Sequence, residues 1–289
     1  MGLPMCANLS AAGHEVIAAD ARPSREQAVT ECGARWAATP AGAASRASIL
    51  ITMLPGPAAV SEVMTGTGGA LAALPPQATW IDMTSSAPAA GRVLAAAARA
   101  RGIAVLDAPA GGGPAAARAG TLQLFAGGEA AVLDRCRPVL EVLADPDRIV
   151  HAGGNGAGYV TKLLVNLLWF GQSIATAEAL LIGSQAGLDL GVLRDALADS
   201  PASSAFIRND LDALLSGDYL PAFGLDRCAE ELTAIAQLAR DLGLPSDMTQ
   251  LTEQTYQRAL HRYGPVKGEL LAVALLEEQA GIRLRHHPH

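Results

Sequence analysis

The chain is poor in charged and aromatic residues, and each scarcity excludes a class of protein. Only 17% of the 289 residues are charged and 4% are aromatic, whereas 50% are hydrophobic, so the composition excludes disorder. A net charge of −7 leaves no clustered positive surface, which argues against a nucleic-acid partner. No uninterrupted apolar run approaches the roughly 18 residues of a membrane span, and no export signal is evident. We therefore expect a soluble cytoplasmic protein without a membrane partner.

Cysteine and lysine are also scarce. The four cysteines lie far apart, without a CxxC pair or a histidine at metal-ligand spacing, so we expect reduced thiols and no metal site. Of the 21 basic residues, 19 are arginine, and the two lysines are Lys162 and Lys267. Because arginine serves this chain for ordinary surface charge, a lysine inside a helix suggests chemistry that guanidinium cannot perform.

The two halves of the chain differ in their pattern. Residues 1–153 alternate short apolar runs with alanine-rich helical stretches, which indicates a parallel sheet with crossover helices. Residues 154–289 show only helical periodicity. Strands are expected at 15–19, 48–53, 79–82, 103–106, 122–126 and 148–151; later helices are expected at 159–186, 191–199, 203–215, 225–242, 247–263 and 269–280. The sequence predicts an α/β domain (1–153) followed by an all-helical domain (154–289), with a frayed tail from residue 283.

The start of the chain corresponds to the second half of a βαβ unit. A helix over residues 4–12, a turn at Gly13 and a strand ending at Asp20 are present, but the preceding strand and the first glycines of a G-x-G-x-x-G loop are not. The missing strand would be the centre of a Rossmann-like sheet, so we expect a gap between its two neighbours. We interpret Met1 as an internal methionine taken as the start.

Polar and small residues follow the predicted strands, where an open α/β sheet binds its ligand. An acid such as Asp20 can bond both ribose hydroxyls and repel a 2′-phosphate, which favours NAD; Arg22 could instead accept the phosphate of NADP, and a simple strand-end turn is the alternative. The glycines after Asp107 expose backbone N–H groups that can cradle a carboxylate; the alternative is that they only form a tight bend.

Lys162 stands at the start of a helix that continues as LLVNLLWF. Tyr159, Lys162 and Asn166 share one helix face. A desolvated ammonium tends to lose its proton, as a general acid/base lysine must. The alternatives are a lysine that extends to water and an asparagine bonded to backbone.

These motifs together resemble the β-hydroxyacid dehydrogenase family, which includes 3-hydroxyisobutyrate dehydrogenase and tartronate semialdehyde reductase. The resemblance covers nearly the whole chain, through MGLPMCANL, TMLPGPAAVSEV, IDMTSSAP, DAPAGGG, GNGAGYVTKLLVN and FGLDRCAEELTAIAQLARDLGLP. It implies a Rossmann domain, a helical domain, an active site between them, and a homodimer or homotetramer. It also implies a small hydroxy-acid substrate and NAD or NADP as cofactor.

The resemblance assigns roles residue by residue. Lys162 matches the catalytic lysine and Asn166 its companion. The loop Gly111, Gly112 and Gly113 and the position of Glu230 match substrate-binding positions. Cofactor-side positions, including Asp20 and Arg22 from the argument above, are Gly2, Asp20, Arg22, Leu54, Pro55 and Thr84.

Two departures from the family pattern bear on the substrate. Gly111 replaces an expected serine, and Glu230-Glu231 replaces a Lys-Asp pair, which exchanges a positive charge for a negative one. We therefore expect a substrate that is less anionic than plain 3-hydroxy acids or that carries an amine. The alternatives to a dehydrogenase are an imine reductase of the same fold, against which Lys162 argues, and a non-catalytic oligomer left by truncation. A 6-phosphogluconate-type decarboxylase is disfavoured because no arginine cluster for a sugar phosphate is evident.

Overall fold

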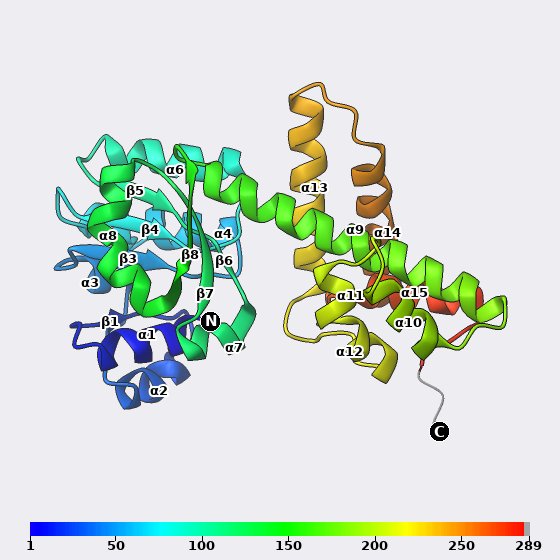
Figure 1. Ribbon diagram of the computed structural model, residues 1–289. Helices are drawn as coiled ribbons and strands as arrows, with labels where there is room; N and C mark the ends of the chain where they lie inside the picture. Colours follow the sequence, from blue (N-terminus) through cyan, green and yellow to red (C-terminus); the bar gives the residue numbers. More distant parts are fainter. Residues whose placement is uncertain (286–289) are drawn as a thin grey trace. The chain divides into compact units, whose positions relative to one another are not determined.

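The computed structural model describes residues 1–285, which belong to two compact units (Figure 1). Unit 1 comprises Met1–Lys162 and unit 2 comprises Leu163–His289. The division lies inside the long helix α9 (Ala157–Gln185), whereas the sequence placed a domain boundary at residue 153, where strand β8 ends. The first turn of α9 is thus part of unit 1.

The main sheet of unit 1 has six strands. Strands β3 (Ile49–Thr52), β4 (Thr79–Asp82) and β5 (Ala104–Asp107) pair in parallel, as predicted. Strand β7 (Leu122–Gly127) pairs antiparallel with β5 and with the short β6 (Ala110–Gly111), and parallel with β8 (Ala144–Gly153). The expectation of a parallel sheet therefore holds for the strands whose ends carry the candidate site.

Successive side chains of the central strands β4 and β5 point into two separate apolar clusters. Trp80 and Val105 pack in one apolar cluster, while Ile81 and Leu106 pack in the other. Because successive side chains of a strand point to opposite faces, strands buried on both faces need helices on both sides. These helices are α3 (Pro40–Ala44), α4 (Pro57–Thr65), α5 (Ala70–Ala73), α6 (Pro88–Arg99), α7 (Gly113–Ala119) and α8 (Ala130–Leu143).

The expected gap in the sheet is present. Strand β1 (Ile17–Ala18) pairs with β2 (Arg35–Trp36) in a separate two-stranded sheet, and within residues 1–285 no strand joins it to β3. Helix α1 (Gly2–Ala11) contributes Met5 and Leu9 to the apolar cluster that also contains Ile49 and Ile51 of β3. A short 3₁₀ turn (Pro23–Arg25) and α2 (Glu26–Glu31), which the sequence analysis did not predict, connect β1 to β2.

Unit 2 is helical, as predicted. Around α9 lie α10 (Leu190–Ala198), α11 (Ala205–Asn209), α12 (Leu211–Ser216), α13 (Leu225–Asp241), α14 (Asp247–Tyr263) and α15 (Leu271–Ala280). The single helix expected over 203–215 is two helices, because Asp210 leaves the helical conformation and its carboxylate accepts a 2.9 Å hydrogen bond from the indole of Trp169.

Helix α9 is long and apolar enough to span a membrane by length and composition alone. The sequence analysis found no such segment because polar residues interrupt every apolar run. In the structure Leu163, Phe170, Ile174, Ala177 and Leu180 of α9 are buried in the two apolar clusters of unit 2. The helix is therefore the central core helix of this unit.

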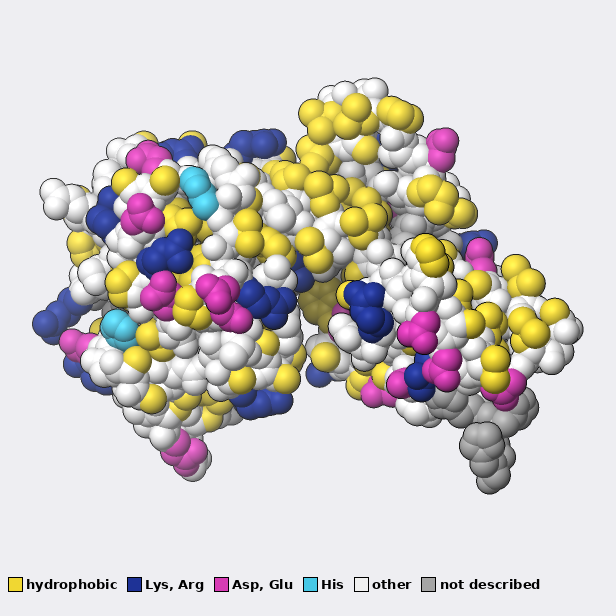
Figure 2. Space-filling model, viewed as in Figure 1, with side chains coloured by type: hydrophobic (Ala, Val, Ile, Leu, Met, Phe, Trp, Pro, Cys, Tyr) yellow, Lys and Arg dark blue, Asp and Glu magenta, His cyan; other side chains and the backbone are white. Residues whose placement is uncertain are grey.

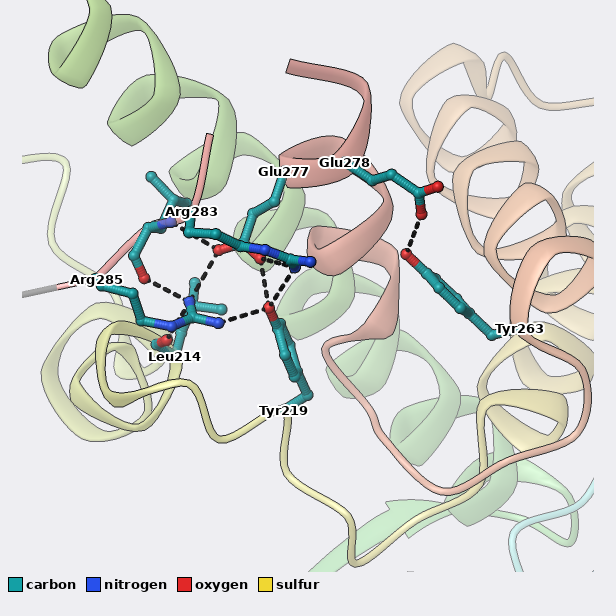
Figure 3. A network of polar contacts seen from close by, with 8 residues as sticks. Leu214, Tyr219, Tyr263, Glu277, Glu278, Arg283 and Arg285 are labelled. Carbon is teal, nitrogen blue, oxygen red and sulfur yellow. Dashed lines mark hydrogen bonds and ion pairs between the residues drawn. The ribbon is translucent and has the colours of Figure 1, made fainter. Parts of the chain in front are cut away.

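The sequence predicted a frayed tail from residue 283, but residues 283–285 are held in place (Figure 3). The buried carboxylate of Glu277 accepts hydrogen bonds from the Leu284 N–H (2.8 Å), from Arg285 (3.0 Å) and from the hydroxyl of Tyr219, and it pairs with Arg283 at 3.3 Å. Residues 283–285 are thereby held against α15. The three histidines of the predicted tail lie outside the described residues.

Candidate active site

The predicted cofactor-side residues Leu54 and Thr84 meet at the carboxyl ends of two neighbouring strands. The backbone N–H of Leu54 donates to the hydroxyl of Thr84 at 3.1 Å, and the N–H of Thr84 donates to the carboxylate of Asp82 at 3.0 Å. Thr84 is 1% exposed, while Pro55, which comes after Leu54, is exposed. The hydroxyl of Thr84 therefore fixes the loop after β3 to the loop after β4.

Asp20 and Arg22 follow β1 and bind each other. The guanidinium of Arg22 donates from Nε to Oδ1 (2.9 Å) and from Nη2 to Oδ2 (3.1 Å) of Asp20. This bidentate contact with Arg22 lowers the pKa of the Asp20 carboxyl. An acid and a base that would select opposite cofactors thus stand side by side on the surface.

Gly2 is the first residue of α1, and an added Cβ would meet nothing within 4 Å. Backbone N–H groups at such a helix start suit a phosphate. With Leu54, Thr84 and Asp20 at strand ends, the residues present fit a dinucleotide.

The glycine loop before α7 has two positions that need glycine and one that does not. Gly112 and Gly113 have φ angles of 103° and 64°, and a Cβ on Gly112 would lie 2.6 Å from that of Ala116. A Cβ on Gly111 would be 3.7 Å from Gln123, an ordinary contact. The absence of the family's serine at Gly111 is therefore not imposed by packing.

The first turn of α9 is fixed to the ends of β4 and β5. Asp107 accepts hydrogen bonds from the N–H of Gly156 (2.7 Å) and of Tyr159 (3.1 Å), and the hydroxyl of Tyr159 donates to Asp82 at 2.7 Å. Burial raises the pKa of Asp107 to about 6 and also raises that of Asp82. Lys162, which is half-buried, lies three residues after Tyr159.

In unit 2, Asn166 is bonded to Glu231, an acid to which the sequence analysis gave no binding role. Its amide donates to the buried carboxylate of Glu231 at 2.6 Å. The neighbouring Glu230, predicted to bind substrate, has a side chain that is 47% exposed and forms an ion pair with Arg227. Asn166 and Glu231 are therefore joined by the structure, whereas Glu230 and Arg227 form a second, more exposed pair.

Sequence reasoning noted some of these residues without a role. Asp82 ends one predicted strand, Asp107 directly follows another, and Tyr159 shares a helix face with Lys162, but no pattern indicated that the two acids bond the first turn of α9. Glu231 came directly after Glu230 in a recognised motif, and which of the two faces inward depended on the rotation of α13. Among residues 1–285 no cluster of three potential metal ligands occurs.

A Rossmann-like unit with these strand-end residues, followed by a helix that carries Lys162, defines an NAD(P)-dependent oxidoreductase. Residues 1–154 match the family model described as the NAD binding domain of 6-phosphogluconate dehydrogenase, and residues 156–276 match that described as NAD-binding of NADP-dependent 3-hydroxyisobutyrate dehydrogenase. The chain therefore belongs to the β-hydroxyacid dehydrogenase family, and its cofactor is NAD or NADP.

Relatives of established name agree with this assignment. The chain is 35% identical to 3-hydroxyisobutyrate dehydrogenase of Pseudomonas aeruginosa over 84% of this chain and 87% of that protein. It is 30% identical to 2-hydroxy-3-oxopropionate reductase of Escherichia coli over 98% and 96%. The structure of Mycobacterium tuberculosis 3-hydroxyisobutyrate dehydrogenase with L-serine superposes with a TM-score of 0.86 at 27% identity, covering 96% of this chain and 95% of that one.

Imine reductases are more distant. That of Myxococcus stipitatus has a TM-score of 0.63 at 18% identity, with 96% of each chain covered, which shows a shared fold alone.

Proposed function

We propose that this enzyme interconverts a small 3-hydroxy acid, or a related hydroxy compound, and its semialdehyde or 3-oxo form, with Lys162 as general acid/base. The observation that carries the proposal is the place of Lys162 one turn beyond a helix start that is hydrogen-bonded to the ends of β4 and β5. These are the strand ends at which a Rossmann-like unit presents its cofactor.

Each residue of the site has its own part in the reaction. A bound nicotinamide supplies the hydride acceptor in oxidation and the hydride donor in reduction. The neutral amine of Lys162 takes the hydroxyl proton during oxidation, and its ammonium returns a proton during reduction. Asn166, held by Glu231, orients the substrate hydroxyl, and the backbone of Gly112 and Gly113 binds its carboxylate.

The cofactor is held by the first turn of α1 at Gly2 and by Leu54, Pro55 and Thr84. We propose NAD as the preferred form because Asp20 can bond the ribose hydroxyls, while NADP remains an alternative through Arg22.

Substitution of Lys162 tests this function. Lys162→Ala should lower kcat by about 10³-fold, because a positioned acid/base group contributes on that order. The dissociation constant of NADH should stay within about threefold of the wild-type value, because the amine acts on the substrate. Lys162→Arg should be nearly as damaging, since guanidinium does not deprotonate near neutral pH. Turnover retained by Lys162→Ala would contradict the assignment.

The substrate proposal concerns charge. We propose a substrate less anionic than plain 3-hydroxy acids, or one that carries an amine, because Gly111 lacks a hydroxyl and Glu230 is negative. Arg227 offsets part of that charge by pairing with Glu230. Kinetics on neutral, amino-bearing and simple 3-hydroxy acids would test it, with Glu230→Gln as the control that should erase any preference for an amine. Best turnover on the simple acids refutes the preference.

Two other functions have distinct outcomes. An imine reductase would reduce cyclic imines and leave alcohols unchanged. A non-catalytic oligomer would not bind NADH, so titration of the purified chain separates it from both enzymes.

For oligomeric state we propose a homodimer, or a homotetramer built from it, in the cytoplasm. On α9, Leu168 and Ile182 are 64% and 71% exposed, and both stand seven residues from the exposed Ala175. Two copies of α9 crossing antiparallel at Ala175 would therefore place each Leu168 beside the other copy's Ile182. A hollow lined by Gln172, Ala175, Thr176, Ala179, Ser204 and Ile207 adjoins this stripe.

The tip between α13 and α14 adds further apolar surface, at Leu242, Leu244 and Met248 (Figure 2). Sedimentation of the wild type should show a dimer or larger assembly, and Leu168→Glu with Ile182→Glu should yield monomers. A monomeric wild type would contradict this proposal.

A further inference from the structure

A buried hydrogen-bond chain runs from the cofactor-side loops to the helix that carries Lys162. It begins at the N–H of Leu54, which donates to Thr84, whose own N–H donates to Oδ1 of Asp82. The other oxygen of Asp82, Oδ2, accepts the hydroxyl of Tyr159 at 2.7 Å. Asp82 and Tyr159 are 1% and 3% exposed, so solvent does not compete for these bonds.

Asp82 is itself held in place by β3. The hydroxyl of Thr52 donates to Oδ1 of Asp82 at 2.8 Å, and the indole of Trp80 donates to Thr52 at 2.9 Å. The carboxylate thus accepts three hydrogen bonds from three different segments. These bonds fix the orientation of the Asp82 carboxylate toward Tyr159.

A second carboxylate fixes the same helical turn by its backbone. Asp107 receives the N–H groups of Gly156 and Tyr159, so Tyr159 is held at both its main chain and its hydroxyl. Packing allows little displacement: a Cβ on Gly158 would lie 2.1 Å from the carbonyl oxygen of Phe125, and one on Gly91 would lie 2.3 Å from the Tyr159 ring.

Two buried acids are an unfavourable way to begin a helix. Burial raises the pKa of both carboxyl groups, which shows that their ionised forms are disfavoured where they stand. A serine or asparagine cap would satisfy the same N–H groups without burying a charge. Two buried acids aimed at one turn of helix therefore point to a need for accurate placement of the residues in the next turn.

We propose that Tyr159, with Asp82 and Asp107, is a positioning residue for the Lys162 amine. The three groups fix the first turn of α9 to the strand ends, and the lysine three residues on takes its place from that turn. This inference rests on the proposed acid/base role of Lys162.

Tyr159→Phe is the sharpest test, because it removes one hydroxyl and keeps the ring beside Gly91. We expect kcat to fall about 10- to 100-fold, since misplacement of a reacting group by about 1 Å has an effect of that size. The KM and the NADH dissociation constant should change less than about threefold, because the hydroxyl is buried and bonded to Asp82. Tyr256→Phe, which removes another buried tyrosine hydroxyl bond (2.9 Å to the carbonyl of Glu269), is the matched control and should leave kcat within about twofold.

A double-mutant comparison shows whether Tyr159 acts through the lysine. In a Lys162→Ala background, Tyr159→Phe should lower the residual rate no further, because there is no amine left to misplace. An equal loss in both backgrounds would overturn the proposal, and so would wild-type kcat in Tyr159→Phe. Should that variant fail to fold, Asp107→Asn serves in its place with the same expected split between kcat and KM. Full turnover in Lys162→Ala alone would instead overturn the proposed function.

Discussion

The guanidinium of Arg22 donates two hydrogen bonds, of 2.9 and 3.1 Å, to the carboxylate of Asp20. The side chains remain 63% and 34% exposed, so a cofactor can reach both. In the binding mode proposed above, a ribose with free hydroxyls would leave the pair intact and use Asp20 as an acceptor. A 2′-phosphate would have to draw Arg22 away from Asp20 and also tolerate the acid's charge.

Asp20→Asn should therefore shift the preference toward NADP. The substitution removes the repulsion and releases Arg22, and we expect the ratio of kcat/KM for NADP over NAD to rise about 10- to 100-fold. Steady-state kinetics with both cofactors measure it. Arg22→Ala is the control, which should leave NAD use nearly unchanged and weaken NADP use; an unaltered ratio in Asp20→Asn would show that this pair lies away from the ribose.

Gly111→Ser should fit without strain and strengthen carboxylate binding. The site has room for a Cβ, and the added hydroxyl can donate to a substrate carboxylate. We expect the KM for a simple 3-hydroxy acid to fall about 3- to 10-fold, the effect of one hydrogen bond to a charged group, with kcat little changed. Gly112→Ser is the contrasting variant, because its φ of 103° and its contact with Ala116 should make it destabilising. A KM unchanged in Gly111→Ser would place the substrate carboxylate elsewhere.

Ionisation of Asp107 should lower the stability of the fold. Burial raises the pKa of Asp107 from 3.8 to about 6, so the folded state holds this proton more tightly than the unfolded state. From this group alone, the free energy of unfolding falls as the pH rises from about 4 to 6 and is level above that range. Urea denaturation across this range measures the free energy of unfolding of the wild type and of Asp107→Asn. The wild-type value minus the variant value should decrease as the pH rises, and an increase would contradict the stated direction.

Loss of the Glu277 carboxylate should be much more damaging than loss of Arg283. Glu277→Gln leaves Arg285 and the Leu284 N–H with a poorer acceptor in a buried position, and we expect a loss of about 3 kcal/mol in the free energy of unfolding. Arg283→Ala removes an ion pair whose arginine is 64% exposed, and should change stability by less than about 1 kcal/mol. Urea denaturation distinguishes the two, and equal effects would mean that the anchoring of residues 283–285 does not depend on Glu277.

Most of the fold was predictable because periodicity and turn residues are local. The short apolar runs predicted at 48–53, 79–82 and 103–106 coincide with β3, β4 and β5, and the helices of unit 2 are bounded by glycine and proline. The short elements between residues 23 and 44 were missed, since two-residue strands and single helical turns leave no period to detect. The break at Asp210 depends on a tertiary bond from Trp169, which no local pattern records.

The candidate site was predictable only where one residue type implies a chemistry. Lys162 stood out because lysine is rare in this chain, and Asp20 because it ends a strand. The bonds from Asp82 and Asp107 to the start of α9 join residues up to 77 positions apart, and they result from strand order and helix placement, not from spacing. The same holds for Glu231, whose contact with Asn166 is set by how α13 packs on α9.

Because the chain has only two lysines, the side-chain amine of Lys162 can be followed separately by chemical modification. The chain's other lysine, Lys267, is exposed in the segment that bridges to Gly224 just before α13, whereas Lys162 is half-buried. Reagents that acylate or reductively alkylate amines therefore meet two side chains in sharply different surroundings. Their peptides can be resolved by mass, so the reactivity of the amine at Lys162 becomes readable with Lys267 as an internal standard.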